Sequence, residues 1–322
     1  MKNYLNFETD IKDLETELEK LKDPYNQEGL SEVNTDKISK IQSEIDDKLN
    51  EVYSNLNSWQ TTLVARHEDR PKSKFFIENL FDDFILLSGD RFYGEDKSVL
   101  TGFAKFNGNS VLVIGQEKGE DLDSRIERNF GMMRPEGYRK TIRLMQLADK
   151  FNIPIISFID TPGAYPGVGA EERGQAEAIA RNLFDMSLLK VPIISVVIGE
   201  GASGGALAIG LCDILLCMEN TWFSVISPEG CASILFRDSS QSKKAADAMK
   251  VSSYDLKEMG IADGIIEEPL GGANTNYKES AIFLKKAFLN ALEQLDGLSS
   301  EELIKNRILK YDKMGHWVGK NE

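Results

Sequence analysis

A glycine-rich segment near the middle of the chain limits the possible folds more than any other feature. Residues 193–213 read IISVVIGEGASGGALAIGLCD, an apolar β-branched run followed by glycines and then by small apolar residues at helical spacing. This order predicts a buried strand, a tight turn and the start of a helix. The first N–H groups of a helix have no partner within it, so such a turn can present main-chain donors to an anion.

Three known motifs fit this one turn. Residues 199–204 match the G-x-G-x-x-G fingerprint of dinucleotide-binding proteins, and residues 201–205 match the G-x-S-x-G nucleophile elbow of hydrolases. Residues 204–206 read Gly-Gly-Ala, which is typical of an oxyanion-binding turn. The sequence therefore predicts an anion site here and leaves the anion to be identified.

Two of these interpretations need partners elsewhere in the chain. Glu219 lies about twenty residues beyond Gly199, where the ribose-binding acid of a dinucleotide fold is expected, so an NAD-dependent oxidoreductase remains the alternative. Against it, the intervening helix is short and the elaborate loop at 160–169 would have no role. A serine hydrolase needs a histidine after Ser203, and only His316 follows it.

The second notable segment, residues 158–174, reads FIDTPGAYPGVGAEERG. Its Asp-Thr-Pro-Gly start is similar to a GTPase loop, but the chain contains no G-x-x-x-x-G-K-[ST] motif. Pro162 and Pro166 fix φ, and the glycines allow close approach of a ligand. We expect a rigid ligand-binding loop at the C-terminal end of a strand, with a purely structural loop as the alternative.

Composition excludes several classes of protein. The 322 residues carry a net charge of −14, which disfavours binding to nucleic acid or to anionic membranes. No apolar run reaches the roughly 20 residues of a membrane span, and the N-terminus lacks an apolar signal core, so we expect a cytoplasmic protein. Lys and Arg are nevertheless concentrated in residues 125–143, which could bind a carboxylate or phosphate or form a solvated or partner-binding face.

Cysteine and histidine usage limits the chemistry. The three cysteines are odd in number and form no C-x-x-C pair, so we expect small buried side chains and no zinc site; they are Cys212, Cys217 and Cys231. The only two histidines, His67 and His316, lie outside the glycine-rich middle. Unless one folds back over a long distance, the site works with backbone donors, each of which contributes roughly 3–4 kcal/mol in measured cases.

Periodicity divides the chain. Residues 1–60 predict a helical hairpin with a turn at 23–29, whose narrow apolar stripe should pack on the main domain or on a partner chain. From about residue 99, buried strands alternate with helices, which predicts an α/β fold with parallel strands and repeated ββα units. The predicted strands are 111–114, 153–159, 193–198, 214–218 and 223–226. The predicted helices are 136–151, 170–189, 203–211 and 276–296, with a capping box at Ser299 and Glu302 opening a last one.

The two glycine-rich segments and several other stretches of the chain resemble the alpha subunits of the bacterial acetyl-CoA carboxylase carboxyltransferase. The similar stretches are 54–71, 77–91, 129–140, 158–183, 197–210, 224–235 and 268–273. The resemblance implies a crotonase-like spiral of ββα units at 61–296, the N-terminal hairpin at 1–60 and a C-terminal helical tail at 297–322. It also implies transfer of a carboxyl group from carboxybiotin to acetyl-CoA to give malonyl-CoA, the first committed step of fatty acid synthesis.

The resemblance assigns partners and roles. Biotin would arrive on a separate biotin carboxyl carrier protein, a zinc-ribbon beta subunit would complete an alpha2beta2 assembly, and ATP would be used elsewhere, by biotin carboxylase. The turn that holds the ureido oxygen of biotin would be Gly204, Gly205 and Ala206. The surrounding carboxybiotin site would be Thr161, Pro162, Gly163, Ala164, Tyr165, Gly201 and Ser203. Candidate anion-binding side chains are Lys118, Arg134 and Arg139.

Two positions depart from the family's pattern. Family members commonly read GHQKG where residues 115–119 read GQEKG, so Gln116 replaces a histidine and Glu117 brings a carboxylate near an expected anion site. Met133 stands where proline is usual, which should relax the local turn. Both glycine loops retain the pattern.

Overall fold

The computed structural model describes residues 2–23 and 35–315; most of the expected hairpin turn and His316 lie outside them. The strands are β1 (Asp82–Leu86), β2 (Val99–Phe106), β3 (Asn109–Gln116), β4 (Ile155–Thr161), β5 (Ile193–Ala202), β6 (Ile214–Met218), β7 (Trp222–Ser224) and β8 (Gly264–Ile266). The helices are α1 (Thr9–Lys22), α2 (Thr35–Tyr53), α3 (Ser58–Ala65), α4 (Ser73–Leu80), α5 (Leu122–Glu127), α6 (Pro135–Lys150), α7 (Val168–Glu172), α8 (Gln175–Ser187), α9 (Ser203–Gly210), α10 (Pro228–Leu235), α11 (Ser242–Met249), α12 (Ser253–Glu258), α13 (Tyr277–Leu295) and α14 (Ser300–Asp312), with 3₁₀ turns η1 (Asn129–Gly131) and η2 (Ser239–Gln241).

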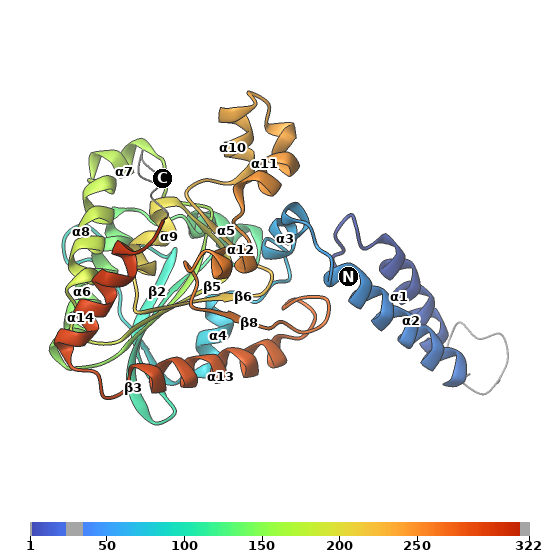
Figure 1. Ribbon diagram of the computed structural model, residues 1–322, viewed down its shortest axis with the longest axis horizontal. Helices are drawn as coiled ribbons and strands as arrows, with labels where there is room; N and C mark the ends of the chain where they lie inside the picture. The colour runs from blue at the N-terminus through green and yellow to red at the C-terminus, as the bar shows by residue number, and fades with distance from the viewer. Residues whose placement is uncertain (1, 24–34, 316–322) are drawn as a thin grey trace, which may run out of the picture.

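One mixed sheet of eight strands forms the centre of the described chain (Figure 1). Its order is β1-β2-β3-β4-β5-β6-β8, and β7 pairs with the end of β5. The first three strands are antiparallel, whereas β3, β4, β5, β6 and β8 run parallel. The C-terminal ends of β3, β4 and β5 therefore meet at one edge, where open α/β sheets bind ligands.

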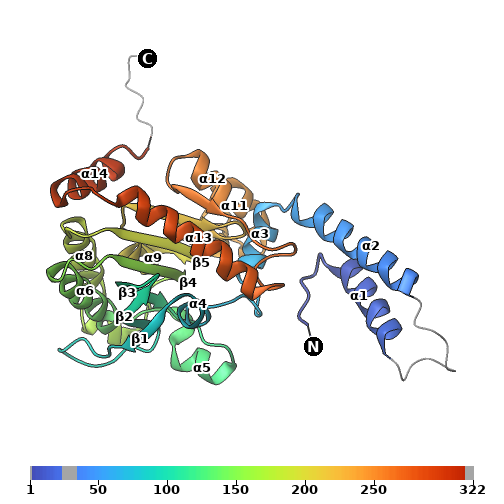
Figure 2. The ribbon, with the colours of Figure 1, turned by 90° about the horizontal axis from the view of Figure 1, so that it is seen from below.

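Helices cover both faces of the sheet, and the strand sequences show why. Neighbouring side chains of a strand point to opposite faces. Ile155 and Ile159 join the core beneath α6, α8 and α9, while Ile156 and Phe158 join the core beneath α4 and α13. Figure 2 shows α13 lying across the second face. Both faces are apolar, as expected of buried parallel strands, and the predicted α/β class is confirmed.

The predicted strands and helices are largely present, but several short elements are not predicted: β8 and the helices α3, α4, α5, α10, α11 and α12. The predicted helix at 170–189 is divided into α7 and α8 at Gly174, whose φ is +81°. The predicted strand at 223–226 ends at Ser224, and Val225 is 80% exposed. Strands β1 and β2 were not predicted; β1 has only a half-buried centre and so lacks a clear apolar alternation.

The N-terminal helices pack against each other. Their apolar stripes form one cluster, with Ile11 and Leu18 of α1 facing Ile41, Ile45 and Leu49 of α2. Figures 1 and 2 both show this pair projecting away from the sheet. The expected packing of the stripe on the main domain is seen only at its end, where a Cβ on Gly271 would lie 3.0 Å from Leu49. Elsewhere the narrow stripes of the two helices bury each other, and packing on a partner chain stays a prediction. None of the described helices is long and apolar enough to cross a membrane.

Helix α14 is fixed to the sheet by a buried arginine. Ser299 and Glu302 form the predicted capping box at its start. Arg307, with its side chain fully buried, pairs with Asp213 at 2.8 Å and donates to the backbone carbonyl oxygens of Met186, Leu189 and Val191. This single side chain ties α14 to the end of α8 and to the β5–β6 region.

Replacing Arg307 with alanine should lower the free energy of unfolding by about 3–5 kcal/mol, because Asp213 would remain buried without its cation. Denaturant unfolding followed by circular dichroism measures this. The exposed Lys305 on the same helix is the matched control, and Lys305→Ala should change stability by less than about 0.5 kcal/mol. Equal midpoints for the two variants would contradict the assigned role of Arg307.

Candidate active site

The two glycine loops meet at the ends of β4 and β5. A Cβ atom added to Gly205 would lie 2.4 Å from the carbonyl carbon of Gly163 and 2.6 Å from the nitrogen of Ala164. Only glycine permits this approach. Gly204 is less crowded, since the nearest atom to an added Cβ is a methyl carbon of Ile179 at 3.3 Å.

The turn presents main-chain donors at the start of α9. Ala202 is the N-cap and makes no side-chain capping hydrogen bond, so the first N–H groups of the helix have no partner from the cap. Ser203 is exposed and has a φ of +58°, a left-handed conformation that turns the chain sharply from strand to helix. Gly204 is half-buried, while Gly205 and Ala206 are buried.

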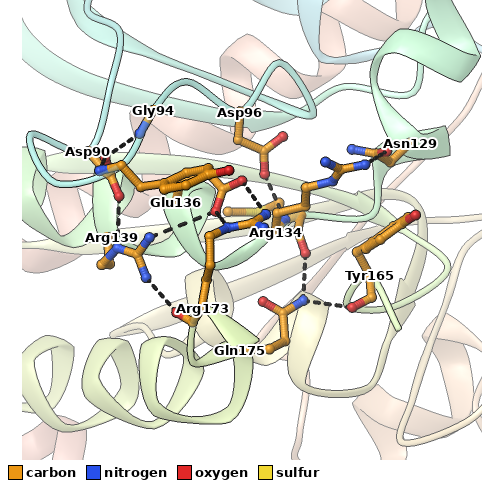
Figure 3. A network of polar contacts seen from close by, with 12 residues as sticks. Asp90, Gly94, Asp96, Asn129, Arg134, Glu136, Arg139, Tyr165, Arg173 and Gln175 are labelled. Carbon is orange, nitrogen blue, oxygen red and sulfur yellow. Dashed lines mark hydrogen bonds and ion pairs between the residues drawn. The ribbon is translucent and has the colours of Figure 1, made fainter. Parts of the chain in front are cut away.

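The loop after β4 is closed on itself and held by Met133, just before α6, and by Gln175 at the start of α8. The Thr161 hydroxyl donates to the Gly163 carbonyl at 2.8 Å and accepts from its N–H at 3.1 Å. The Tyr165 N–H donates to the Met133 carbonyl, and Gln175 Nε2 donates to the carbonyls of both residues (Figure 3). Thr161 through Tyr165, including Pro162 and Ala164, is thus a rigid loop beside the α9 turn.

Two glycines of the possible dinucleotide fingerprint have packing roles instead. A Cβ on Gly199 would lie 2.4 Å from an Asp160 carboxylate oxygen, and one on Gly201 would lie 2.5 Å from the Phe223 ring. Glu219, the candidate ribose-binding acid, accepts hydrogen bonds from the Tyr254 hydroxyl and the Glu268 N–H. The geometry gives no support to the dinucleotide interpretation.

A compact ion cluster lies at the same strand ends. Lys118 Nζ is 2.7 Å from Asp160 Oδ1 and 2.8 Å from Glu200 Oε1, and Arg66 Nε is 2.7 Å from the other oxygen of Glu200. Burial opposes ionisation of Glu200, but the nearby Lys118 and Arg66 outweigh it and hold the pKa of Glu200 below its ordinary value. Burial likewise opposes the charge of Lys118, yet the two carboxylates raise its pKa.

Gln116 connects the ion cluster to the glycine turn. Its fully buried amide donates to the Gly205 carbonyl at 2.7 Å and accepts from the Asp160 N–H at 3.1 Å. The only signal of this role in the sequence is that Gln116 departs from the family's pattern. Met133, the other departure, is buried with its sulfur 3.4 Å from the same amide nitrogen.

Glu117 faces away from the turn. Its carboxylate accepts from the N–H groups of Lys74, in the first turn of α4, and of Gly119, at 2.7 and 2.9 Å. Burial raises the pKa of Glu117, although these two hydrogen bonds act in the opposite direction. The carboxylate accepts a hydrogen bond at the start of α4 and does not point toward the donors of the glycine loops.

The candidate anion-binding side chains lie in three different settings. Lys118 is engaged with two carboxylates, as described above. The Arg134 guanidinium stacks 4.5 Å over the Tyr165 ring and donates to Asn129 (Figure 3). Arg139 pairs with Asp90 at 2.8 Å and donates to the Arg173 carbonyl. Arg134 contacts the loop after β4 through the Tyr165 ring.

One histidine does fold back to the strand ends. His67 lies beside Asp160 and Glu200 in a cavity at this edge, an arrangement that the long sequence separation hid. Its Nδ1 accepts from the Asp69 N–H and its Nε2 lies 3.1 Å from the Asn3 carbonyl, so the hydrogen-bond pattern assigns the proton to Nε2. With both nitrogens bound to backbone groups, His67 is not placed as a general base.

Metal ligands do not gather in the described chain. No group of three or more His, Cys, Asp or Glu side chains within residues 2–23 and 35–315 could hold a metal ion. Cys212 and Cys217 are buried and Cys231 is half-buried. What the site offers chemically is a set of main-chain donors on a rigid turn beside neutralised carboxylates.

Comparison with known proteins identifies relatives of this chain. Residues 4–315 match the family model described as acetyl co-enzyme A carboxylase carboxyltransferase-like. A Pelagibacter ubique protein named acetyl-coenzyme A carboxylase carboxyl transferase subunit alpha is 65% identical over 99% of this chain and 87% of its own length. The Bordetella pertussis protein of the same name is 47% identical over 98% and 97%.

Solved structures share the fold. Transcarboxylase 12S, 20% identical, aligns with a TM-score of 0.57 over 80% of this chain and 46% of its own. The beta subunit of Pseudomonas aeruginosa geranyl-CoA carboxylase, 14% identical, aligns with a TM-score of 0.55 over 77% and 46%. These similarities confirm the predicted crotonase-like α/β fold.

Replacing Lys118 with methionine should make the protein unfold at a higher pH on acidification. The stability that Glu200 contributes is present at neutral pH and is lost as the pH falls through its lowered folded-state pKa. Removing the cation 2.8 Å away raises that pKa, so the loss begins earlier. Circular dichroism as a function of pH gives the midpoint.

The exposed ion pair between Lys105 and Asp83 provides the control for this titration. Lys105→Met should leave the acid midpoint almost unchanged, because exposed pairs contribute little. A midpoint for Lys118→Met equal to that of Lys105→Met would show that the buried cluster does not govern acid stability.

Proposed function

The chain belongs to the acetyl-CoA carboxylase carboxyltransferase family, and we propose that it is the alpha subunit, which transfers a carboxyl group from biotin to acetyl-CoA to form malonyl-CoA. The observation that carries the proposal is the contact between the α9 turn and the loop after β4, which fixes the main-chain donors of the turn against a rigid loop. Such donors suit an oxygen that becomes negatively charged during the reaction.

We assign the ureido oxygen of biotin to the N–H groups of Gly204, Gly205 and Ala206. The uncapped first turn of α9 fits this oxygen, since it offers donors without an ionisable partner. Biotin, when bound, supplies the transferable carboxyl group and the base, which agrees with a site whose nearby histidine is committed to the backbone. Thr161, Pro162, Gly163, Ala164 and Tyr165 would exclude water from one side, with Gly201 and Ser203 completing the wall.

The proposal includes partners and organisation. One turn provides donors for one developing anion, so the enolate of acetyl-CoA needs donors from the beta subunit. We therefore propose that the chain is active only in the alpha–beta complex. This complex would be an alpha2beta2 assembly with the zinc ribbon on the beta chain. The carrier protein would deliver biotin and the ATP-dependent biotin carboxylase would load it, in the cytoplasm. We further propose an N-terminal hairpin (1–60), a carboxyltransferase domain (61–296) and a helical tail (297–322) as the functional units.

Gly204→Val should lower malonyl-CoA formation by about 100-fold or more, because the side chain obstructs the turn's donors. The assay combines the purified chain with its beta subunit, a carboxylated biotin derivative and acetyl-CoA. The side chain of Ile179, whose methyl carbon would lie 3.3 Å from an added Cβ, has to shift to make room, so we expect a loss of thermal stability that is small beside the loss of turnover. Gly205 is unsuitable for this test, because a side chain there would push the Gly163–Ala164 backbone away.

Gly94 provides the matched control. An added Cβ there meets nothing within 4 Å, so Gly94→Ala should retain activity. Omitting the beta subunit tests the shared site directly. Full malonyl-CoA formation by the isolated chain would refute the dependence on a beta partner, and full activity of Gly204→Val would refute the assigned turn.

Gln116→Leu should reduce turnover of the complex about tenfold or more, as it leaves the Gly205 carbonyl and the Asp160 N–H buried without partners. Gln116→His should restore much of the loss, since a neutral imidazole has one donor and one acceptor nitrogen. Both variants are assayed at a temperature at which circular dichroism finds them folded. If Gln116→Leu loses only stability and keeps its turnover, Gln116 does not position the turn.

A further inference from the structure

Strand β7 lies beside the end of β5, on the side opposite β4. Gly201 pairs with Thr161 of β4 and with Phe223 of β7, so the end of β5 is held from both sides. β7 runs parallel to β5, and its last residue, Ser224, pairs with Ala202, the residue before the glycine turn. The residues that follow β7 therefore continue past the end of β5, level with that turn.

The connection from β7 to α10, residues 225–227, is packed onto the start of α10. Its first residue, Val225, is largely exposed although it is apolar. Ile226 lies against Gly230, since a Cβ atom added to this glycine would be 2.8 Å from the Ile226 side chain. The Ser227 hydroxyl accepts from the Gly230 N–H at 3.2 Å. A shift of α10 would therefore move the connection with it.

The α10–α11 pair stands apart from the helices that cover the sheet (Figure 1). The two helices pack on each other, and α11 packs on α3. The first turn of α10 reaches the main domain, where Glu229 pairs with Arg66, the residue that ends α3. The position of α10 beside the glycine turn thus depends on this ion pair and on the packing between α11 and α3.

Arg66 joins two carboxylates from different parts of the fold. Its Nε donates to Glu200 Oε2 at 2.7 Å, and its Nη1 donates to Glu229 Oε1 at 2.6 Å. The guanidinium carbon also lies 5.4 Å from the centre of the Trp222 ring in β7. One planar side chain therefore contacts the end of β5, β7 and the first turn of α10, which a lysine with its single ammonium group could not do.

Both partners of the bridge between Arg66 and Glu229 are charged at neutral pH. Burial opposes the ionisation of Glu229, but the hydrogen bond and the charge of Arg66 outweigh it and hold the pKa of Glu229 below its ordinary value. Burial likewise opposes the charge of Arg66, yet Glu200 and Glu229 raise its pKa. Glu229 also lies in the first turn of α10, where the helix dipole favours a negative charge.

We propose that Arg66 is a positioning residue for the biotin site: through Glu229 it fixes α10, and through α10 it fixes residues 225–227 beside the glycine turn. The proposal rests on the proposed function, which assigns biotin to that turn. The connection would form the wall of the site opposite the loop after β4, and Arg66 itself would touch no substrate. Loss of the bridge should weaken binding of the biotin substrate and spare acetyl-CoA, whose enolate is assigned to donors of the beta subunit.

Glu229→Ala breaks the bridge and leaves the pair of Arg66 with Glu200 in place. In the alpha–beta complex it should raise the KM for a carboxylated biotin derivative at least fivefold and leave the KM for acetyl-CoA unchanged. Glu301→Ala removes an exposed carboxylate from the first turn of α14, so it is the matched control and should change neither KM. Adding Glu229→Ala to Arg66→Met should raise the KM no further, since the two residues act through one contact.

Hydrogen–deuterium exchange of the full chain tests the structural part of the proposal without substrate. Glu229→Ala should speed the exchange of the amides in residues 225–235 at least fivefold, because the start of α10 loses its contact with the main domain. Exchange in α13, on the far face of the sheet, should stay the same. Equal exchange of residues 225–235 in the wild type and the variant would overturn the proposal.

The kinetic outcomes separate this proposal from the proposed function. If the wild-type complex forms malonyl-CoA and Glu229→Ala leaves the KM for the biotin derivative unchanged, the positioning role fails and the proposed function stands. Equal rises in both KM values would also overturn the positioning role, because a general loss of structure produces them. A wild-type complex that forms no malonyl-CoA would defeat the proposed function itself.

Discussion

The candidate site depends on the approach of the Gly205 backbone to the Gly163–Ala164 peptide. Any side chain at 205 would overlap this peptide, at 2.4 Å from the nearest carbon, so the two loops touch only because the residue is glycine. Parallel strands β4 and β5 bring both loops to one edge of the sheet. Gln116 then ties the Gly205 carbonyl to the Asp160 N–H. The donors of α9 are thereby fixed before any ligand arrives, which is what electrostatic stabilisation of an anion requires.

The arrangement of charge explains why we assign the binding of the anion to main-chain donors. In a chain with a net charge of −14, most cations near the strand ends are bound to carboxylates. Lys118 and Arg66 pair with Asp160 and Glu200 in a buried cluster, so they are not available to a substrate anion. Main-chain dipoles have no such competitor and do not titrate. A turn built from them keeps the same character over a wide pH range.

The sequence predicts the central strands and the glycine turn because these signals are local. An apolar β-branched run followed by closely spaced glycines specifies β5 and α9 without knowledge of the rest of the chain. The partners of Lys118 could not be predicted in this way, because Asp160 and Glu200 reach it only once the sheet has formed. The position of His67 could not be predicted for the same reason. Its long separation from the glycine loops conceals a position at the same sheet edge.

The departures from the family's pattern at residues 116 and 117 can be explained only once the position of these residues at the end of β3 is known. Neighbouring residues at the end of a strand point to opposite faces, so a change at 116 and a change at 117 act on different surroundings. Gln116 faces the turn, where an amide can donate and accept at once. Glu117 faces α4, where a carboxylate can accept from an N–H group of the first helical turn. The added negative charge therefore stabilises the start of a helix and lies away from the donors of the glycine loops.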